Sequence, residues 1–197
     1  PVVIHGRGFA PSAEVSLTWT TVTGNRVGGS GWDEQASELT RLQARSDGAF
    51  VHALPVPDDL GGPHRIVATV DAATAATTEL TITPSVVEFS PARGPVGTEI
   101  VINLKGVGWT ETANIYHLVY DNGYLGYACG FNSQGDVVIR LPATGTPGWH
   151  FIDLYPGIYK GKDVPGVQNF RIPQLTYEAD HPGEDLPAFR FAFEVTP

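Results

Sequence analysis

The sequence predicts an all-β protein built from two β-domains in tandem. Short segments in which apolar and polar residues alternate recur along all 197 residues, a period of two that is typical of half-buried strands. Turn signals separate these segments at intervals of about 8–12 residues, as in sandwiches of short strands. The 23 glycines and 16 prolines fit the many tight turns that such a fold needs, and no segment has a convincing helical period.

In the first half, turn residues delimit each predicted strand. Ser46-Asp47-Gly48 precedes one strand, Pro55 ends it, and Pro84 ends the last strand of this half. Residues 22–32 are rich in glycine and predict a loop or hairpin tip, whereas residues 38–44 fit either a strand or a helical turn, of which we favour the strand. The predicted strands are residues 2–4, 15–19, 38–44, 49–54, 64–70 and 79–83.

The second half opens with a turn-rich stretch, residues 90–97, which contains Pro91, Gly94, Pro95 and Gly97. A clear alternating strand follows, and Gly106-Val107-Gly108-Trp109 ends it with a tight bend. The predicted strands here are residues 98–104, 115–119, 136–141, 148–152 and 193–196.

Five landmarks occur in the same order in both halves, which indicates a tandem duplication. We therefore expect two domains, residues 1–83 and 84–197. The first copy has no counterpart of residues 90–97, so we expect its leading strand to be missing. The matched landmarks are Gly8-Phe9 with Gly108-Trp109, 15–19 with 115–119, Ser46-Asp47-Gly48 with Ser133-Gln134-Gly135, 62–66 with 148–152, and 80–84 with 193–197.

About seven short strands in each half, without helices, indicate an immunoglobulin-like β-sandwich in each domain. The opening of the second domain, from Pro91 to Ile102 and then Gly106 to Trp109, resembles that of IPT/TIG-type and related bacterial surface Ig-like modules. Residues 6–11 of the first domain are similar to modules repeated in secreted bacterial proteins. The resemblance implies an extracellular or cell-surface location and a spacer, adhesive or enzyme-appendage role, with no catalytic residues to transfer.

Charge and composition narrow the choice of partners. A net charge of −9 with scattered Lys and Arg argues against a nucleic-acid or anionic-membrane surface. No run approaches the ~20 apolar residues that span a bilayer, so we expect no membrane insertion. The chain starts within an apolar strand and has no Met, from which we expect a segment of a longer protein whose other domains are partners. No cofactor is expected.

The second domain holds the candidate ligand-binding residues. Asn122-Gly123 lies between apolar strands and predicts a hairpin turn. The alternative function of this region is a tyrosine platform, on which aromatic faces stack against sugar rings while Asp121, Asn122 and Asn132 bind hydroxyl groups. A glycan or a protein is the expected ligand. The candidate residues are Tyr120, Asp121, Asn122, Tyr124, Tyr127, Tyr155 and Tyr159.

Other constellations have a structural interpretation and a functional one. Cys129, His150 and Asp153 are the residue types of a hydrolase with a cysteine nucleophile, but a single Cys in a strand is more often a small buried apolar residue. The acidic pairs Asp58-Asp59, Asp180-His181 and Glu184-Asp185 lack the spacing of a calcium loop and fit solvated turns better. We expect no metal site.

The second domain also carries an insertion at about residues 156–187, rich in Pro, Gly and charged residues. Segments 170–172 and 175–177 within it are candidate short strands. A loop this long either contributes to function or covers a sheet edge. The sequence thus predicts a non-catalytic binding module and spacer, the alternatives being a carbohydrate-binding accessory domain and, third, a hydrolase using Cys129.

Overall fold

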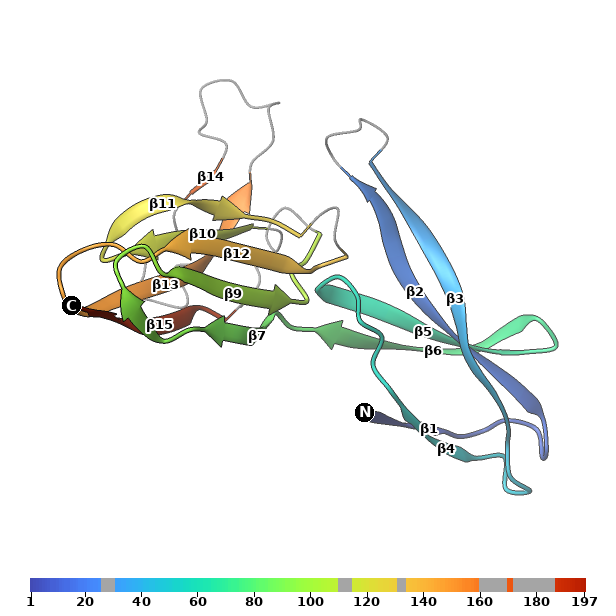
Figure 1. Ribbon diagram of the computed structural model, residues 1–197. Coiled ribbons are helices and arrows are strands. Elements are labelled where there is room, and N and C mark those ends of the chain that lie inside the picture. The colour runs from blue at the N-terminus through green and yellow to red at the C-terminus, as the bar shows by residue number, and fades with distance from the viewer. Residues whose placement is uncertain (26–30, 110–114, 131–133, 160–169, 172–186) are drawn as a thin grey trace. The chain divides into compact units, whose positions relative to one another are not determined.

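A computed structural model describes residues 1–25, 31–109, 115–130, 134–159, 170–171 and 187–197 (Figure 1). Strands make up 69% of it, and the described residues contain no helix, which confirms the all-β prediction. The chain forms two compact units. The first unit consists of residues 1–58 and 63–81, and the second of residues 59–62 and 82–197.

The first unit contains a two-stranded and a four-stranded sheet. Its core holds Val15, Leu17, Phe50 and Ala68, which come from both sheets. The strands are β1 (Val2–Gly6), β2 (Glu14–Asn25), β3 (Gly31–Gln43), β4 (Phe50–Leu54), β5 (Gly62–Val70) and β6 (Ala73–Ile82), paired in the orders β1-β4 and β3-β2-β5-β6.

The second unit has a small sheet, β12-β9-β7, and a large sheet, β11-β10-β13-β15-β8, with β14 paired to β13 (Figure 1). Ile102 of the small sheet and Ile152 and Phe193 of the large sheet are fully buried in one core cluster, so the two sheets form a sandwich. The strands are β7 (Ser85–Ser90), β8 (Arg93–Pro95), β9 (Glu99–Lys105), β10 (Ile115–Tyr120), β11 (Gly123–Ala128), β12 (Val137–Pro142), β13 (Gly148–Tyr159), β14 (Phe170–Arg171) and β15 (Phe189–Thr196).

The turn-rich opening of the second unit takes part in both of its sheets. β7 pairs antiparallel with β9 in the small sheet. After Pro91 the chain changes sheets, and β8 pairs parallel with the end of β15 in the large sheet. Residues 93–95, expected as a turn, are therefore a short strand whose partner is distant in the sequence.

The two units share a set of local irregularities. The pairing of β2 with β3 shifts register between Leu17 and Thr18, and the pairing of β10 with β11 shifts between Leu118 and Val119. In each unit an aromatic residue that follows this shift within two positions, Trp19 or Tyr120, stacks on a buried histidine. The ring centroids are 4.5 Å apart for Trp19 and His64, and 5.7 Å apart for Tyr120 and His150.

A similar backbone hydrogen bond is also found just after β1 in the first unit and just after β9 in the second. The N–H of Phe9 donates to the carbonyl of Gly48 at 3.1 Å, and the N–H of Val107 donates to that of Gly135 at 3.0 Å. The glycines before these donors, Gly8 and Gly106, have φ values of 82° and 71°. By this hydrogen bond Gly8 corresponds to Gly106, which lies two residues before the Gly108 of the expected match.

Several expected boundaries differ from the observed ones. Residues 38–44 lie in or beside β3, which settles the ambiguity there in favour of a strand. β2 and β3 extend to Asn25 and from Gly31, further into residues 22–32 than expected. Of the insertion at 156–187, the structure describes the end of β13, β14 and Pro187, and segment 175–177 lies outside the described residues.

A candidate ligand-binding face

The outer face of the large sheet carries a group of exposed aromatic side chains. Along β13 alternate residues point to opposite faces, so His150, Ile152 and Leu154 are buried, whereas Trp149 and Phe151 are 63% and 58% exposed. On β11, Tyr124 and Tyr127 are 40% and 52% exposed, with exposed Leu125 between them. We call the side chains of Tyr124, Tyr127, Trp149 and Phe151, which lie on the outer face of the large sheet, the aromatic face.

Strand register brings these side chains close to polar groups. Val119 of β10 lies between Tyr124 of β11 and Asp153 of β13, and Asp153 is in turn opposite Arg190 of β15. Side chains that lie opposite one another on a sheet are in contact range. Arg190 Nε is 3.4 Å from Asp153 Oδ1, so an ion pair between an exposed guanidinium and a largely buried carboxylate lies within this surface.

A shallow depression of about 320 Å³ lies on the same face. Its lining combines an apolar ring with carboxylate, amide and guanidinium groups, the mixture by which small sites bind and orient polar ligands. The Tyr155 hydroxyl is partly withdrawn from water and bonded to Asp153, and both effects raise its pKa. The lining residues are Asp121, Asn122, Phe151, Asp153, Tyr155 and Arg190.

The hairpin expected at Asn122-Gly123 is present, one residue earlier than the Asn-Gly pair suggests. Tyr120 pairs with Gly123, which leaves Asp121 and Asn122 as the two-residue loop. Their φ values of 46° and 64° are those of a type I′ turn, which matches the twist of the flanking strands. The turn places both side chains at the rim of the depression.

Asp121 is tied to the adjacent strand by two hydrogen bonds. Its Oδ1 accepts the N–H of Phe151 at 2.9 Å, and its Oδ2 accepts from His150 Nδ1 at 2.5 Å. His150 Nε2 donates to the Thr146 carbonyl at 2.8 Å. Because both ring nitrogens face acceptors, the ring is best satisfied as an imidazolium cation.

The pKa values of this pair move in opposite directions. The hydrogen bond to Asp121, followed by that to Thr146, raises the pKa of His150. Partial desolvation acts to raise the pKa of Asp121, but the hydrogen bonds from His150 and Phe151 outweigh it, so the pKa of Asp121 is lowered. Both shifts favour the charged forms of the two groups.

The tyrosines predicted to form a platform divide between surface and core. Tyr124 and Tyr127 are exposed on the aromatic face. Tyr120 instead packs against the core and donates its hydroxyl to the Thr144 carbonyl at 2.9 Å, so its ring is a structural element. Tyr155 is only 5% exposed and contributes one edge to the depression. The Tyr159 side chain and Asn132 lie outside the described residues.

Cys129, His150 and Asp153 do not come together. His150 is bonded to Asp121 and Thr146, and neither nitrogen is left to activate a thiol. Cys129 follows Ala128, which is aligned through Tyr116 with Pro156 at the far end of β13. That is six residues from His150, or about 20 Å along the strand.

Sequence reasoning missed two members of the aromatic face, Trp149 and Phe151, and one residue that lines the depression, Arg190. The period-2 pattern contained a signal for Trp149 and Phe151. In residues 149–154, His150, Ile152 and Leu154 lie on the buried face, so the residues between them belong to the exposed face. Arg190 had no such signal, since its place opposite Asp153 depends on the register of β15, which follows the insertion.

Metal-ligating groups are not assembled within the described part of the chain, where no three His, Cys, Asp or Glu side chains converge. Asp59 is buried and accepts hydrogen bonds from the Leu60 N–H at 2.8 Å and Gln134 Nε2 at 3.1 Å, which explains it structurally. Asp180-His181 and Glu184-Asp185 lie outside the described residues.

Among the residues that the structure describes, no helix is long and apolar enough to cross a membrane.

No protein-family model matches the sequence, and no curated protein matches it.

Proposed function

We propose that the chain is a non-catalytic binding module whose ligand is held by the aromatic face of the second unit. The observation that carries this proposal is the exposure of Trp149 and Phe151 on β13 and of Tyr124 and Tyr127 on β11, on the face of the large sheet that also holds the polar depression. Single exposed apolar residues are normal on a protein surface, but several large apolar side chains on one face, together with a polar depression, are typical of an interaction site.

The ligand class that this chemistry favours is a carbohydrate. Flat aromatic rings pack against the C–H faces of a sugar, and the carboxylates of Asp121 and Asp153 accept hydrogen bonds from its hydroxyls. Arg190 and Asn122 add donors to the same rim. A protein ligand is the second candidate, favoured by exposed Leu125 on β11, which lies at the end of the large sheet.

We further propose that the two units are tandem copies of one immunoglobulin-like sandwich, in a protein that is extracellular or on a bacterial cell surface. Support for the duplication comes from three local features that both units contain. These are the register shift, the aromatic–histidine stack, and the backbone hydrogen bond that Phe9 or Val107 donates to a glycine carbonyl. The location rests on the resemblance to IPT/TIG-type modules alone. In this proposal the first unit acts as a spacer.

The absence of catalysis is proposed from the role of His150. Its hydrogen bonds to Asp121 and Thr146 occupy both ring nitrogens, and Asp153 is engaged by Arg190. A general base needs a free lone pair directed at its substrate.

A glycan array probed with the whole chain tests the proposal. The double substitution Trp149→Ala and Phe151→Ala removes two exposed rings and leaves the core intact. We expect it to weaken binding to array hits by at least about tenfold, because each ring stack contributes roughly 1 kcal/mol. The matched control is Val138→Ala, an equally exposed apolar residue on the small sheet.

Equal loss of binding in the control would contradict the proposal, as would full binding by the double variant. If the chain binds nothing on the glycan array but binds a protein on a protein array, and the double substitution abolishes that binding, the face would be assigned to a protein ligand instead.

A further inference from the structure

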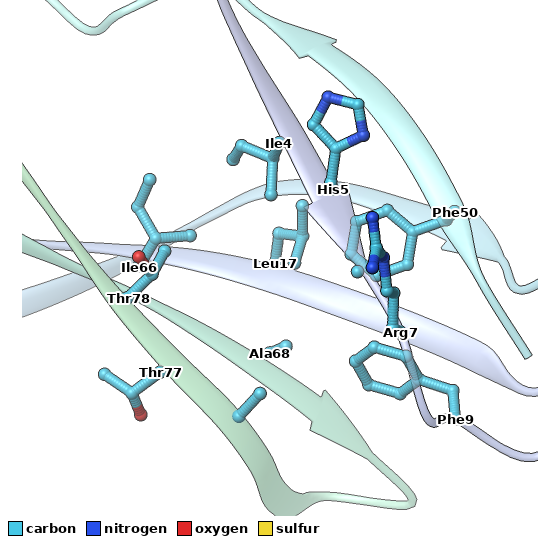
Figure 2. Close-up of a pocket in the computed structure, with 12 residues that line it drawn as sticks. Ile4, His5, Arg7, Phe9, Leu17, Phe50, Ile66, Ala68, Thr77 and Thr78 are labelled. Atoms are coloured by element: carbon cyan, nitrogen blue, oxygen red, sulfur yellow. The ribbon is translucent and has the colours of Figure 1, made fainter.

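The first unit contains a groove of about 240 Å³ between its first and last strands (Figure 2). Leu17 and Phe50 of the core line the groove, together with Ile4 of β1. Thr77 and Thr78 of β6 lie across the groove from His5 and Arg7 (Figure 2). The groove is thus bounded by one strand from each of the two sheets.

Both bounding strands have an open edge within the described part of the chain. β1 pairs with β4 alone, and β6 pairs with β5 alone. A strand edge presents a row of backbone donors and acceptors that can pair with another strand. The groove therefore combines two pairing edges with an apolar floor.

The second unit shows what occupies the corresponding place there. The segment β7–β8 pairs first with β9 and then with β15. Within it, Phe89 lies opposite Ile102 and stacks on Phe191 of β15, with ring centroids 4.7 Å apart. A strand with one large aromatic side chain thus closes the sandwich.

Register relates Ile4 of the groove to Ile102. Phe9 and Val107 make the same hydrogen bond in their units, and counting five residues back from each reaches Ile4 and Ile102. Ile102 is fully buried under Phe89, whereas Ile4 is only half-buried and lines the groove. In the first unit, the position next to Ile4 that corresponds to that of Phe89 is therefore part of the groove and can accept a large apolar side chain.

Charge adds a further requirement for an occupant. The same register relates His5 to Asn103, whose amide donates to the Glu88 carboxylate of β7. His5 and Arg7 are exposed at the groove of a protein with a net charge of −9. Two basic side chains here favour a carboxylate in a neighbouring strand.

We propose that this groove binds an extended peptide strand, antiparallel to β1, by β-augmentation. The peptide places a large apolar side chain between Ile4 and Thr77, and a carboxylate beside His5. Backbone pairing supplies the affinity, and the two side chains supply the specificity. The site is separate from the aromatic face, so each can fail without the other.

A synthetic peptide with the sequence of residues 85–98 is the probe, since it carries both required side chains. It is titrated into the whole isotope-labelled chain and followed by amide NMR shifts. We expect shifts in β1 and β6, and an affinity at least about tenfold higher than that of the same peptide with Asp at the Phe89 position.

Two substitutions on β6 complete the test. Thr78→Arg crowds the groove and is expected to weaken peptide binding by about tenfold or more. Thr74→Arg adds the same charge on the same exposed strand, four residues away and outside the groove, and is expected to leave the affinity within about twofold. Absent binding, equal effects of the two substitutions, or shifts confined to β9 and β15 would each overturn the proposal.

Discussion

At the residue scale, Asp121 and His150 illustrate how one contact organises the candidate face. The carboxylate bridges the hairpin turn to β13 through His150 and the Phe151 N–H. His64 of the first unit is buried in a comparable place, but its Nδ1 donates to the Thr20 carbonyl at 2.9 Å. The carboxylate that binds His150 comes from the turn that lines the depression of the second unit.

The pKa shifts of this pair define the pH range in which it stabilises the fold. The folded-state pKa of His150 is raised, so its contribution is full below the unfolded value near 6.5 and is lost as pH rises through the folded value. The pKa of Asp121 is lowered, so its contribution is present above the unfolded value of 3.8 and is lost as pH falls through the folded value. The pair stabilises most between these limits.

The substitution Asp121→Asn tests this linkage, because asparagine keeps the turn conformation but removes the charge. We expect the His150 pKa to fall towards 6.5 and the second unit to lose about 1 kcal/mol at about pH 5.5, a modest value because the carboxylate is partly exposed. NMR titration of the histidine rings and urea unfolding measure the two effects. Asp47→Asn, in an exposed turn of the first unit, is the control; an unchanged His150 pKa in Asp121→Asn would contradict the assignment.

At the element scale, the hairpin of β10 and β11 fixes the position of the exposed tyrosines. A two-residue loop sets the pairing register, and register decides which side chains of β11 face outward. The shift between Leu118 and Val119 then places Tyr124, opposite Val119, and Tyr127, opposite His117, on the same face. The turn and the register shift together place both rings on the face of the sheet that holds the depression.

The substitution Asn122→Val should destabilise this hairpin, because a β-branched residue is strained at a φ of 64°. We expect a loss of about 1–2 kcal/mol in the second unit. Asn122→Gly is the matched control and should retain stability, since glycine adopts positive φ without strain. Urea unfolding monitored by far-UV circular dichroism compares the two; equal stability of the valine and glycine variants would exclude the type I′ turn.

At the scale of the whole molecule, the period-2 pattern was sufficient to predict the all-β class. It worked because strands of both units alternate buried and more exposed residues, as in Gly62–Val70 of β5 and Val137–Pro142 of β12. It failed for Arg93–Pro95, where the turn formers Gly94 and Pro95 lie in a strand because they pair with distant β15. Local patterns carry no information about such long-range pairing.

The candidate site was predicted less completely than the fold. The Asp121-Asn122 turn and the exposed Tyr124 and Tyr127 followed from residue type and spacing. The packing of Tyr120 against the core and the burial of Tyr155 at one edge of the depression could not be predicted, because a tyrosine serves equally well in a core and on a surface and only strand register separates the two. The pairing of Asp153 with Arg190 likewise depends on β15, beyond the insertion.

The central claim is that the aromatic face binds the ligand, and hydrogen exchange of the whole chain with and without the strongest array hit tests it most directly. We predict that the ligand slows exchange in residues 121–127 of the hairpin and 149–155 of β13, where the exposed rings and the depression lie. Exchange in β9 and β12 should be unchanged. Protection confined to the small sheet or to the first unit would contradict the account.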